Sequence, residues 1–135
     1  MATRKKAPSP RTRTPRQRPV SPEPPPPPPA WGVCVDAAGE KKATGIRALD
    51  LRPITSFADY FVLCSGANQR QNQAICDEVL RQMKVRGEMP NSVEGYNNAE
   101  WILMDYGDLV VHIFSEKARA YYDLDRLWRD AAEAG

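Results

Sequence analysis

Apolar side chains along residues 31–135 alternate between two spacings, which predict helices and strands in turn. A first helix is expected to end by Gly45, and its apolar positions, three and four residues apart, are Trp31, Cys34, Val35 and Ala38. Residues 46–51 and 59–65 are rich in β-branched and aromatic side chains, and the turn-forming stretch 52–56 separates them. Both segments are therefore predicted as strands.

A second helix is marked at both of its ends. Asn68, followed three residues later by Gln71, resembles a capping box, and Gly87 supplies a C-terminal stop. The apolar positions between them keep helical spacing, and they are Ile75, Val79, Leu80 and Met83. A short strand is expected after this helix, at residues 92–94.

The last third of the chain predicts a β-hairpin and a final helix. Residues 99–106 and 109–114 form the two arms of the hairpin around Gly107. Beyond Ser115 the pattern is helical, and we expect Leu127 and Trp128 in the core. The whole order predicts an α/β domain with one mixed, five-stranded sheet flanked by helices.

Residues 1–30 have a different composition from the rest. They hold 11 of the 13 prolines, seven of the Lys and Arg residues and only one acid, so this part carries a net charge of +6 and residues 31–135 one of −4. We expect a disordered basic arm on a globular domain of residues 31–135, with Pro24 to Pro29 as a stiff polyproline II spacer. An inert arm, a weak contact to nucleic acid and a targeting segment all fit this composition.

Several classes of protein are excluded at this point. No apolar run approaches the ~20 residues that a membrane span needs, and the N-terminus lacks the apolar stretch of a signal peptide. We therefore expect a soluble, cytosolic protein with no membrane partner. The odd number of cysteines, all among apolar neighbours, favours reduced core thiols; they are Cys34, Cys64 and Cys76.

No catalytic pattern in the sequence has a suitable spacing. The single histidine, His112, lies in the middle of a predicted strand, where it is either a packed side chain or part of a recognition surface. Asp123 and Asp125 form a D-x-D pattern, but alternate positions of a helix diverge by about 200° and cannot grip one metal ion together. Asp105 and Asp108 flank the predicted turn, where acids usually shape the backbone. We expect no enzyme activity, no metal ligands and no cofactor.

One stretch is unusual in charge. Residues 88–116 contain six acids and neither Lys nor Arg, together with Tyr96, Trp101, Tyr106 and Phe114. An acidic surface with aromatic side chains repels phosphate backbones and suits a basic protein partner. The alternative is that the aromatic side chains are core and the acids are a solvated rim.

Short motifs in this stretch and on both sides of it carry a family resemblance. In order along residues 41–131, the matching pieces are Asp59-Tyr60-Phe61, Cys64-Ser65-Gly66, Glu94-Gly95, the segment from Trp101 to Asp108, the segment from Val110 to Phe114, Arg119, Tyr122-Asp123-Leu124-Asp125 and Leu127-Trp128. Together they resemble the ribosomal silencing factor family, also called the Iojap family. The basic arm is a departure from the family pattern, and so is Asp125, where the family usually has Glu.

The resemblance implies a nucleotidyltransferase-like fold without catalytic residues. It implies binding to universal ribosomal protein fourteen on the large subunit, which would block association with the small subunit when nutrients are scarce. An assembly factor for the large subunit of an organelle and a degenerate nucleotidyltransferase-like enzyme are the alternatives. The basic arm could add a weak contact to ribosomal RNA, and exposed strand edges leave a homodimer open.

We expect the partner to bind on and beside the hairpin. The hairpin residues chosen are Trp101, Asp105, Tyr106, Asp108, His112 and Phe114, and the residues beside it are Tyr60, Glu94 and Arg119. Arg119 is expected to pair with one of the hairpin acids or to form an ordinary surface ion pair.

Overall fold

A computed structural model describes residues 26–135 of the chain. The predicted basic arm lies almost wholly outside the described residues. Within them, no helix is long and apolar enough to cross a membrane.

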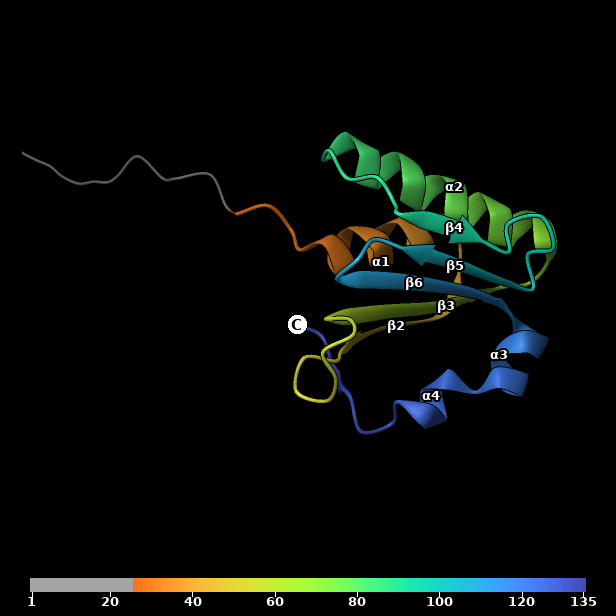
Figure 1. Cartoon of the computed structure of the whole chain (residues 1–135). Helices are drawn as coiled ribbons and strands as arrows, with labels where there is room; N and C mark the ends of the chain where they lie inside the picture. Colours follow the sequence, from red (N-terminus) through yellow and green to blue (C-terminus); the bar gives the residue numbers. More distant parts are fainter. Residues whose placement is uncertain (1–25) are drawn as a thin grey trace, which may run out of the picture.

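The described residues form one sheet with helices on both of its faces (Figure 1). The helices are α1 (Ala30–Glu40), α2 (Gln69–Val85), α3 (Glu116–Tyr122) and α4 (Leu124–Leu127). The strands are β2 (Thr44–Asp50), β3 (Tyr60–Gly66), β4 (Ser92–Glu94), β5 (Trp101–Asp105), β6 (Leu109–Ser115) and β7 (Ala132–Glu133). Their spatial order is β4-β5-β6-β3-β2-β7. Only β3 and β6 run parallel among neighbouring strands, so the sheet is mixed, as predicted.

The two faces of the sheet are covered to different extents. Helices α1 and α2 pack on one face, where Val62, Ile102 and Ile113 are completely buried beneath them. On the other face, α3, α4 and the last residues lie on the side of β2 and β3 (Figure 1). This second cover is short, and it leaves part of the face over β4, β5 and β6 without a helix.

Several predicted local features are confirmed. The Asn68 side chain accepts a hydrogen bond of 2.8 Å from the Gln71 backbone N–H and caps α2. The hairpin closes with a 2.8 Å hydrogen bond from the Tyr106 N–H to the Leu109 carbonyl. All three cysteines are free and buried, and burial raises the pKa of each thiol to about 12.

The C-terminal segment differs from the prediction in two ways. The expected single helix is broken at Asp123, whose φ of 50° places it in the left-handed region, and only the short helices α3 and α4 form. The sheet has six strands and not five, because Ala132 and Glu133 pair with Asp50 and Leu49 of β2.

The break also changes which side chains reach the core. Leu127 is 69% exposed, so its assignment to the core was wrong. Trp128 is half-buried, with its ring edge-on to Phe61 at 5.5 Å between centroids. Because of the turn at Asp123, α4 does not continue α3, and Leu127 and Trp128 do not face the sheet together.

Candidate protein-docking face

The uncovered part of the second sheet face is the candidate site. Alternate residues of a strand share a face, and the pairing of Glu94 with Leu103 brings β4 and β5 into register there. We call this surface the open face and define it by Glu94, Trp101, Leu103, Asp105 and Val110. Glu94 is exposed, and the other four are partly buried. The open face is therefore a mixture of carboxylates and apolar surface, with no Lys or Arg.

A hollow of about 400 Å³ lies within the open face. We call it the face hollow. Its lining residues are Phe57, Phe61, Asn91, Leu103, Asp105, Gly107, Val110 and His112. Aliphatic and aromatic walls with one carboxylate at the side suit an apolar or an aliphatic-cationic side chain of a partner.

His112 lies in the wall of this hollow and is only 4% exposed. The Trp101 Nε1–H donates a 3.0 Å hydrogen bond to His112 Nδ1, which places the proton of the neutral imidazole on Nε2. Burial lowers the pKa of His112 to about 4, so the ring is neutral at pH 7. His112 Nε2 is buried and has no hydrogen-bond partner among residues 26–135. The packed-histidine interpretation is confirmed, and the role of His112 towards a partner stays a prediction.

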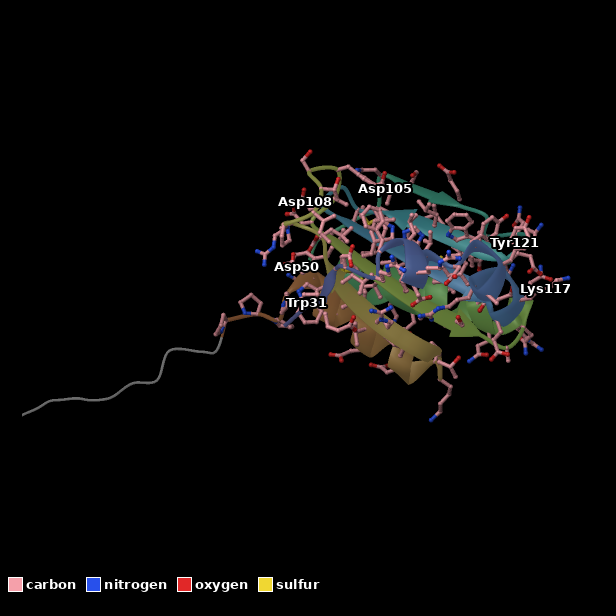
Figure 2. All side chains as sticks on the ribbon, turned by 90° about the horizontal axis from the view of Figure 1, so that it is seen from below. Trp31, Asp50, Asp105, Asp108, Lys117 and Tyr121 are labelled. Atoms are coloured by element: carbon pink, nitrogen blue, oxygen red, sulfur yellow. The ribbon has the colours of Figure 1, made fainter. Side chains whose placement is uncertain are left out.

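The turn of the hairpin places its two acids at one end of the sheet. Asp105 Oδ1 accepts a 2.7 Å hydrogen bond from the Gly107 N–H and shapes the turn, as predicted. Figure 2 shows Asp105 and Asp108 at the same end of the molecule as Asp50 and Trp31, and opposite Tyr121 and Lys117. This end of the described chain is therefore rich in carboxylates.

Tyr60 and Tyr106 lie on the other side of the sheet from the open face. Both pack against the core beneath α1 and α2, and both line a second, smaller hollow of about 210 Å³ at the hairpin end. We call this second cavity the end hollow. The nine predicted residues therefore do not form one surface, since they divide between two sides of the hairpin and the interior.

Phe114 belongs to the interior. It is 1% exposed and packs against Trp101, with ring centroids 5.1 Å apart. A side chain with so little exposure cannot contact a partner directly, so its place among the surface residues was wrong. Phe114 supports the open face from below.

Of the two alternatives for Arg119, the pairing with a hairpin acid was wrong. Its guanidinium pairs with Asp125, with Nη2 2.9 Å from Oδ1 and Nε 3.0 Å from Oδ2, and it does not pair with a hairpin acid. Arg47 binds the same carboxylate from β2 at 2.9 Å. These two cations hold the pKa of Asp125 down, at about 2. Arg119 therefore attaches the C-terminal segment to the sheet instead of ordering the hairpin.

Sequence reasoning missed four side chains around the open face. Leu103 and Val110 alternate with core residues in their strands, and that spacing was the available signal. Phe57 is 61% exposed in the loop before β3, and Tyr122 is 50% exposed with its ring 4.7 Å from that of Trp101. Neither Phe57 nor Tyr122 could be found from spacing, because tertiary packing alone brings them beside β5 and β6.

The D-x-D pair does not form a metal site. Asp123 is the turn residue between α3 and α4, and Asp125 is held by two arginines. Among residues 26–135 there is no group of three or more His, Cys, Asp or Glu side chains that could hold a metal ion.

The fold and the open face define a small α/β domain that presents an acidic, partly apolar surface of the kind that binds protein. The model of the family "Ribosomal silencing factor during starvation" matches residues 24–134. The chain belongs to the ribosomal silencing factor family, as its motifs had indicated.

Relatives and solved structures agree with this assignment. The chain is 41% identical over 99 residues to ribosomal silencing factor RsfS of Bacillus subtilis, covering 73% of this chain and 84% of the relative. It is 27% identical to the mouse protein named "Mitochondrial assembly of ribosomal large subunit protein 1", of which it covers 40%. A crystal structure of a Chromobacterium violaceum protein superposes with a TM-score of 0.71 at 31% identity, covering 73% of this chain and 82% of that one.

Proposed function

We propose that this protein silences translation by binding the large ribosomal subunit through universal ribosomal protein fourteen and blocking the approach of the small subunit. The proposal rests on family membership and on one feature of the molecule, the open face. A basic ribosomal protein is a fitting partner for a surface that joins carboxylates to exposed apolar side chains.

The open face provides both parts of a typical protein interface. Leu103, Val110 and Trp101 supply apolar contact area at its centre, where binding energy is usually concentrated. Glu94 and Asp105 lie beside them and supply charge complementarity, which increases the rate of association and fixes register. We infer that the partner's contact lies here and extends around the hairpin to Asp108.

To block the small subunit, the protein only has to occupy its site on the large subunit, and no chemical reaction is required. An interface of standard size buries ~800 Å² on each partner, which is enough to hold a domain of this size where the two subunits meet. Silencing then depends on the affinity for the large subunit and on the concentration of the protein relative to the small subunit. We accordingly propose that the protein is not an enzyme.

The docking face can be tested by co-sedimentation with purified large subunits at physiological salt. Glu94→Lys with Asp108→Lys reverses two exposed charges beside the open face, and we expect binding to weaken at least about ten-fold because several ion contacts become repulsive. Asp36→Lys with Glu40→Lys makes the same change in net charge on the exposed side of α1, and should leave binding within about two-fold. Equal effects of the two pairs would place the interface elsewhere.

A second function, assembly of the large subunit in an organelle, has one observation in its favour. The name of the mouse relative refers to mitochondrial assembly, and the Arabidopsis thaliana relative is named as an Iojap-related mitochondrial protein. The relatives of higher identity are bacterial, which favours silencing in a bacterial cytoplasm. Depletion of the protein separates the two functions, since an assembly factor leaves immature large subunits and a silencing factor leaves mature ones.

The enzyme alternative has its own test. A nucleotidyltransferase-like activity requires a nucleoside triphosphate and Mg²⁺, and these ligands together would raise the melting temperature if they bound. We expect no shift at millimolar concentrations of both. A shift of several degrees would contradict the proposal that the protein is not an enzyme.

A further inference from the structure

The end hollow shares only Asp108 with the proposed docking contact. It has a volume of about 210 Å³ and opens where α1, β3 and β6 begin. Its lining residues are Pro29, Ala30, Trp31, Asp59, Tyr60, Glu88, Tyr106, Asp108 and Leu109. Three aromatic rings and three carboxylates therefore surround one small cavity.

The aromatic part of this lining is suited to a cation. Trp31 and Tyr60 lie with their ring centroids 6.2 Å apart. The faces of Trp and Tyr rings attract ammonium and guanidinium groups. One such contact already exists at this end of the molecule, where the Arg52 guanidinium lies 5.1 Å from the centroid of the Tyr60 ring.

Two of the three carboxylates of the lining form no ion pair within residues 26–135. Glu88 pairs with Arg86 at 2.8 Å, but no ion pair within residues 26–135 involves Asp59 or Asp108. The 2.7 Å hydrogen bond from the Asp59 N–H to the Asp108 carbonyl joins the backbones of these two residues, so their side chains stay close to the same opening. A cation in the hollow therefore meets aromatic rings and two carboxylates that form no other ion pair within the described residues.

The chain enters the domain at this same place. Pro29 and Ala30 form part of the wall, and all seven basic residues of the preceding segment lie between Arg4 and Arg18. The stiff spacer from Pro24 to Pro29 extends about 16 Å at ~3.1 Å per residue, and the 11 residues from Arg13 to Glu23 can span up to ~38 Å, so the basic segment is long enough to return to the hollow. A tether whose reach exceeds the distance to its site gives an effective concentration of up to the order of millimolar, which suffices to fill a weak site.

We propose that the end hollow is a binding site for an arginine or lysine side chain, and that its occupant is the basic segment of this chain, residues 4–18. The segment covers the acidic hairpin end of the free protein. A basic partner that contacts Asp108 must then displace it, so the segment competes with docking.

A spin label tests the proposal in the free protein without a ribosome. Gln17→Cys gives one accessible thiol, because the three native cysteines are 0% exposed. We expect the nitroxide to broaden the NMR signals of the Trp31 indole and the Leu109 amide at low salt, with intensities at least about five-fold below the reduced sample. The Tyr121 amide, which lies at the opposite end of the molecule, should be unaffected.

Charge variants make the result specific. Asp59→Asn with Asp108→Asn should abolish most of the broadening, and so should 0.5 M salt, at which screening extends over only a few ångströms. Glu40→Gln with Glu116→Gln removes the same charge at the end of α1 and the start of α3, away from the hollow, and should change nothing. Broadening that is the same in both pairs, or that salt does not reduce, would mean that the tether alone brings the label near, and would overturn the proposal.

Binding of a free arginine derivative tests the end hollow without the contribution of the tethered basic segment. In the chain with Arg11, Arg13, Arg16 and Arg18 each changed to Gln, millimolar N-acetyl-arginine methylamide should shift the Trp31 indole signal. The uncharged citrulline analogue of the same shape should not. If neither compound shifts it, the hollow is not a cation site and the proposal fails.

The competition with docking rests on the proposed function and has a separate readout. The same four substitutions should raise the affinity for large subunits by about two-fold or more, since the displaced segment no longer competes. A fall in affinity would show that the segment's main contact is with ribosomal RNA and would overturn the competition. The NMR result stands independently of this outcome.

Discussion

His112 shows how a buried polar side chain is kept neutral by its surroundings. The rings of Trp101, Phe61 and Phe114 surround it, with centroids between 4.6 and 6.0 Å away, and Trp101 supplies its hydrogen bond. The sequence predicted a packed strand histidine, because the residue alternates with apolar positions. It could not name Trp101 as the partner, since that contact depends on the register between β5 and β6.

The depressed pKa of His112 makes stability depend on pH. In the unfolded chain the imidazole has a pKa near ~6.5, and in the folded protein the value is about 4, so the unfolded state binds more protons between these values. The free energy of unfolding should therefore fall by about 3 kcal/mol as the pH drops from 6.5 to 4, as measured by urea unfolding.

His112→Gln removes this titration and serves as the control. Asp125 has a folded pKa of about 2, so its contribution is lost only at lower pH, and the range from pH 6.5 to 4.5 isolates the histidine. The variant should have a nearly flat profile in that range. A slope as steep as that of the unchanged protein would assign the effect to another group.

The backbone at Gly95 lies close to the backbone of Trp101 at the start of β5, and a substitution at Gly95 tests how much this contact contributes to stability. The φ of Gly95 is +81°, and a Cβ there would lie 2.1 Å from the Trp101 carbonyl oxygen. Gly95→Ala should lower the free energy of unfolding by about 2 kcal/mol or more, because the backbone must move. Gly39→Ala in α1 meets no atom within 4 Å and should raise stability by up to about 1 kcal/mol. Similar effects at both glycines in thermal unfolding would contradict this account.

The C-terminal segment is the element whose structure differs most from its sequence pattern. The apolar residues between Leu124 and Ala131 have helical spacing. The left-handed turn at Asp123 nevertheless ends α3, and the chain then crosses to the edge of β2. The reason is tertiary. Arg119 and Arg47 both bind Asp125, and Arg47 also reaches Glu133 at 2.6 Å, so ion pairs hold the segment in a path that a single straight helix could not follow.

Asp125→Asn tests this attachment. Two partly buried arginines would lose their shared anion, which should cost about 1–3 kcal/mol of stability and speed hydrogen exchange of the amides from Trp128 to Glu133. Arg52→Gln removes an ion pair with Asp50 in which the Arg52 side chain is 58% exposed, and should lower stability much less than Asp125→Asn. Exchange in the segment that is unchanged by Asp125→Asn would show that packing alone holds it.

At the scale of the whole molecule, charge divides along the chain as the composition indicates. Residues 88–116 carry acids without Lys or Arg, and the fold places them along β4, β5 and the hairpin, so the acidic surface could be predicted from the sequence. The division of this surface into an open face and an end hollow could not be predicted from the sequence. It depends on the pleat of the strands and on the position of α1, which determine the side of the hairpin that each side chain reaches. Phe114 was misplaced because Trp101 and Ala118 of α3 cover it in the folded protein, and Arg119 was misplaced because the turn at Asp123 brings Asp125 beside it.

The most direct test of the account measures the joining of purified ribosomal subunits by light scattering. Large subunits incubated with an excess of this protein should associate with small subunits much more slowly and to a lower final level than untreated ones. The Glu94→Lys, Asp108→Lys protein should restore association, and the Asp36→Lys, Glu40→Lys protein should inhibit as strongly as the unchanged chain. Association at full rate and full extent in the presence of excess unchanged protein would contradict the central claim that it acts by occupying the subunit interface.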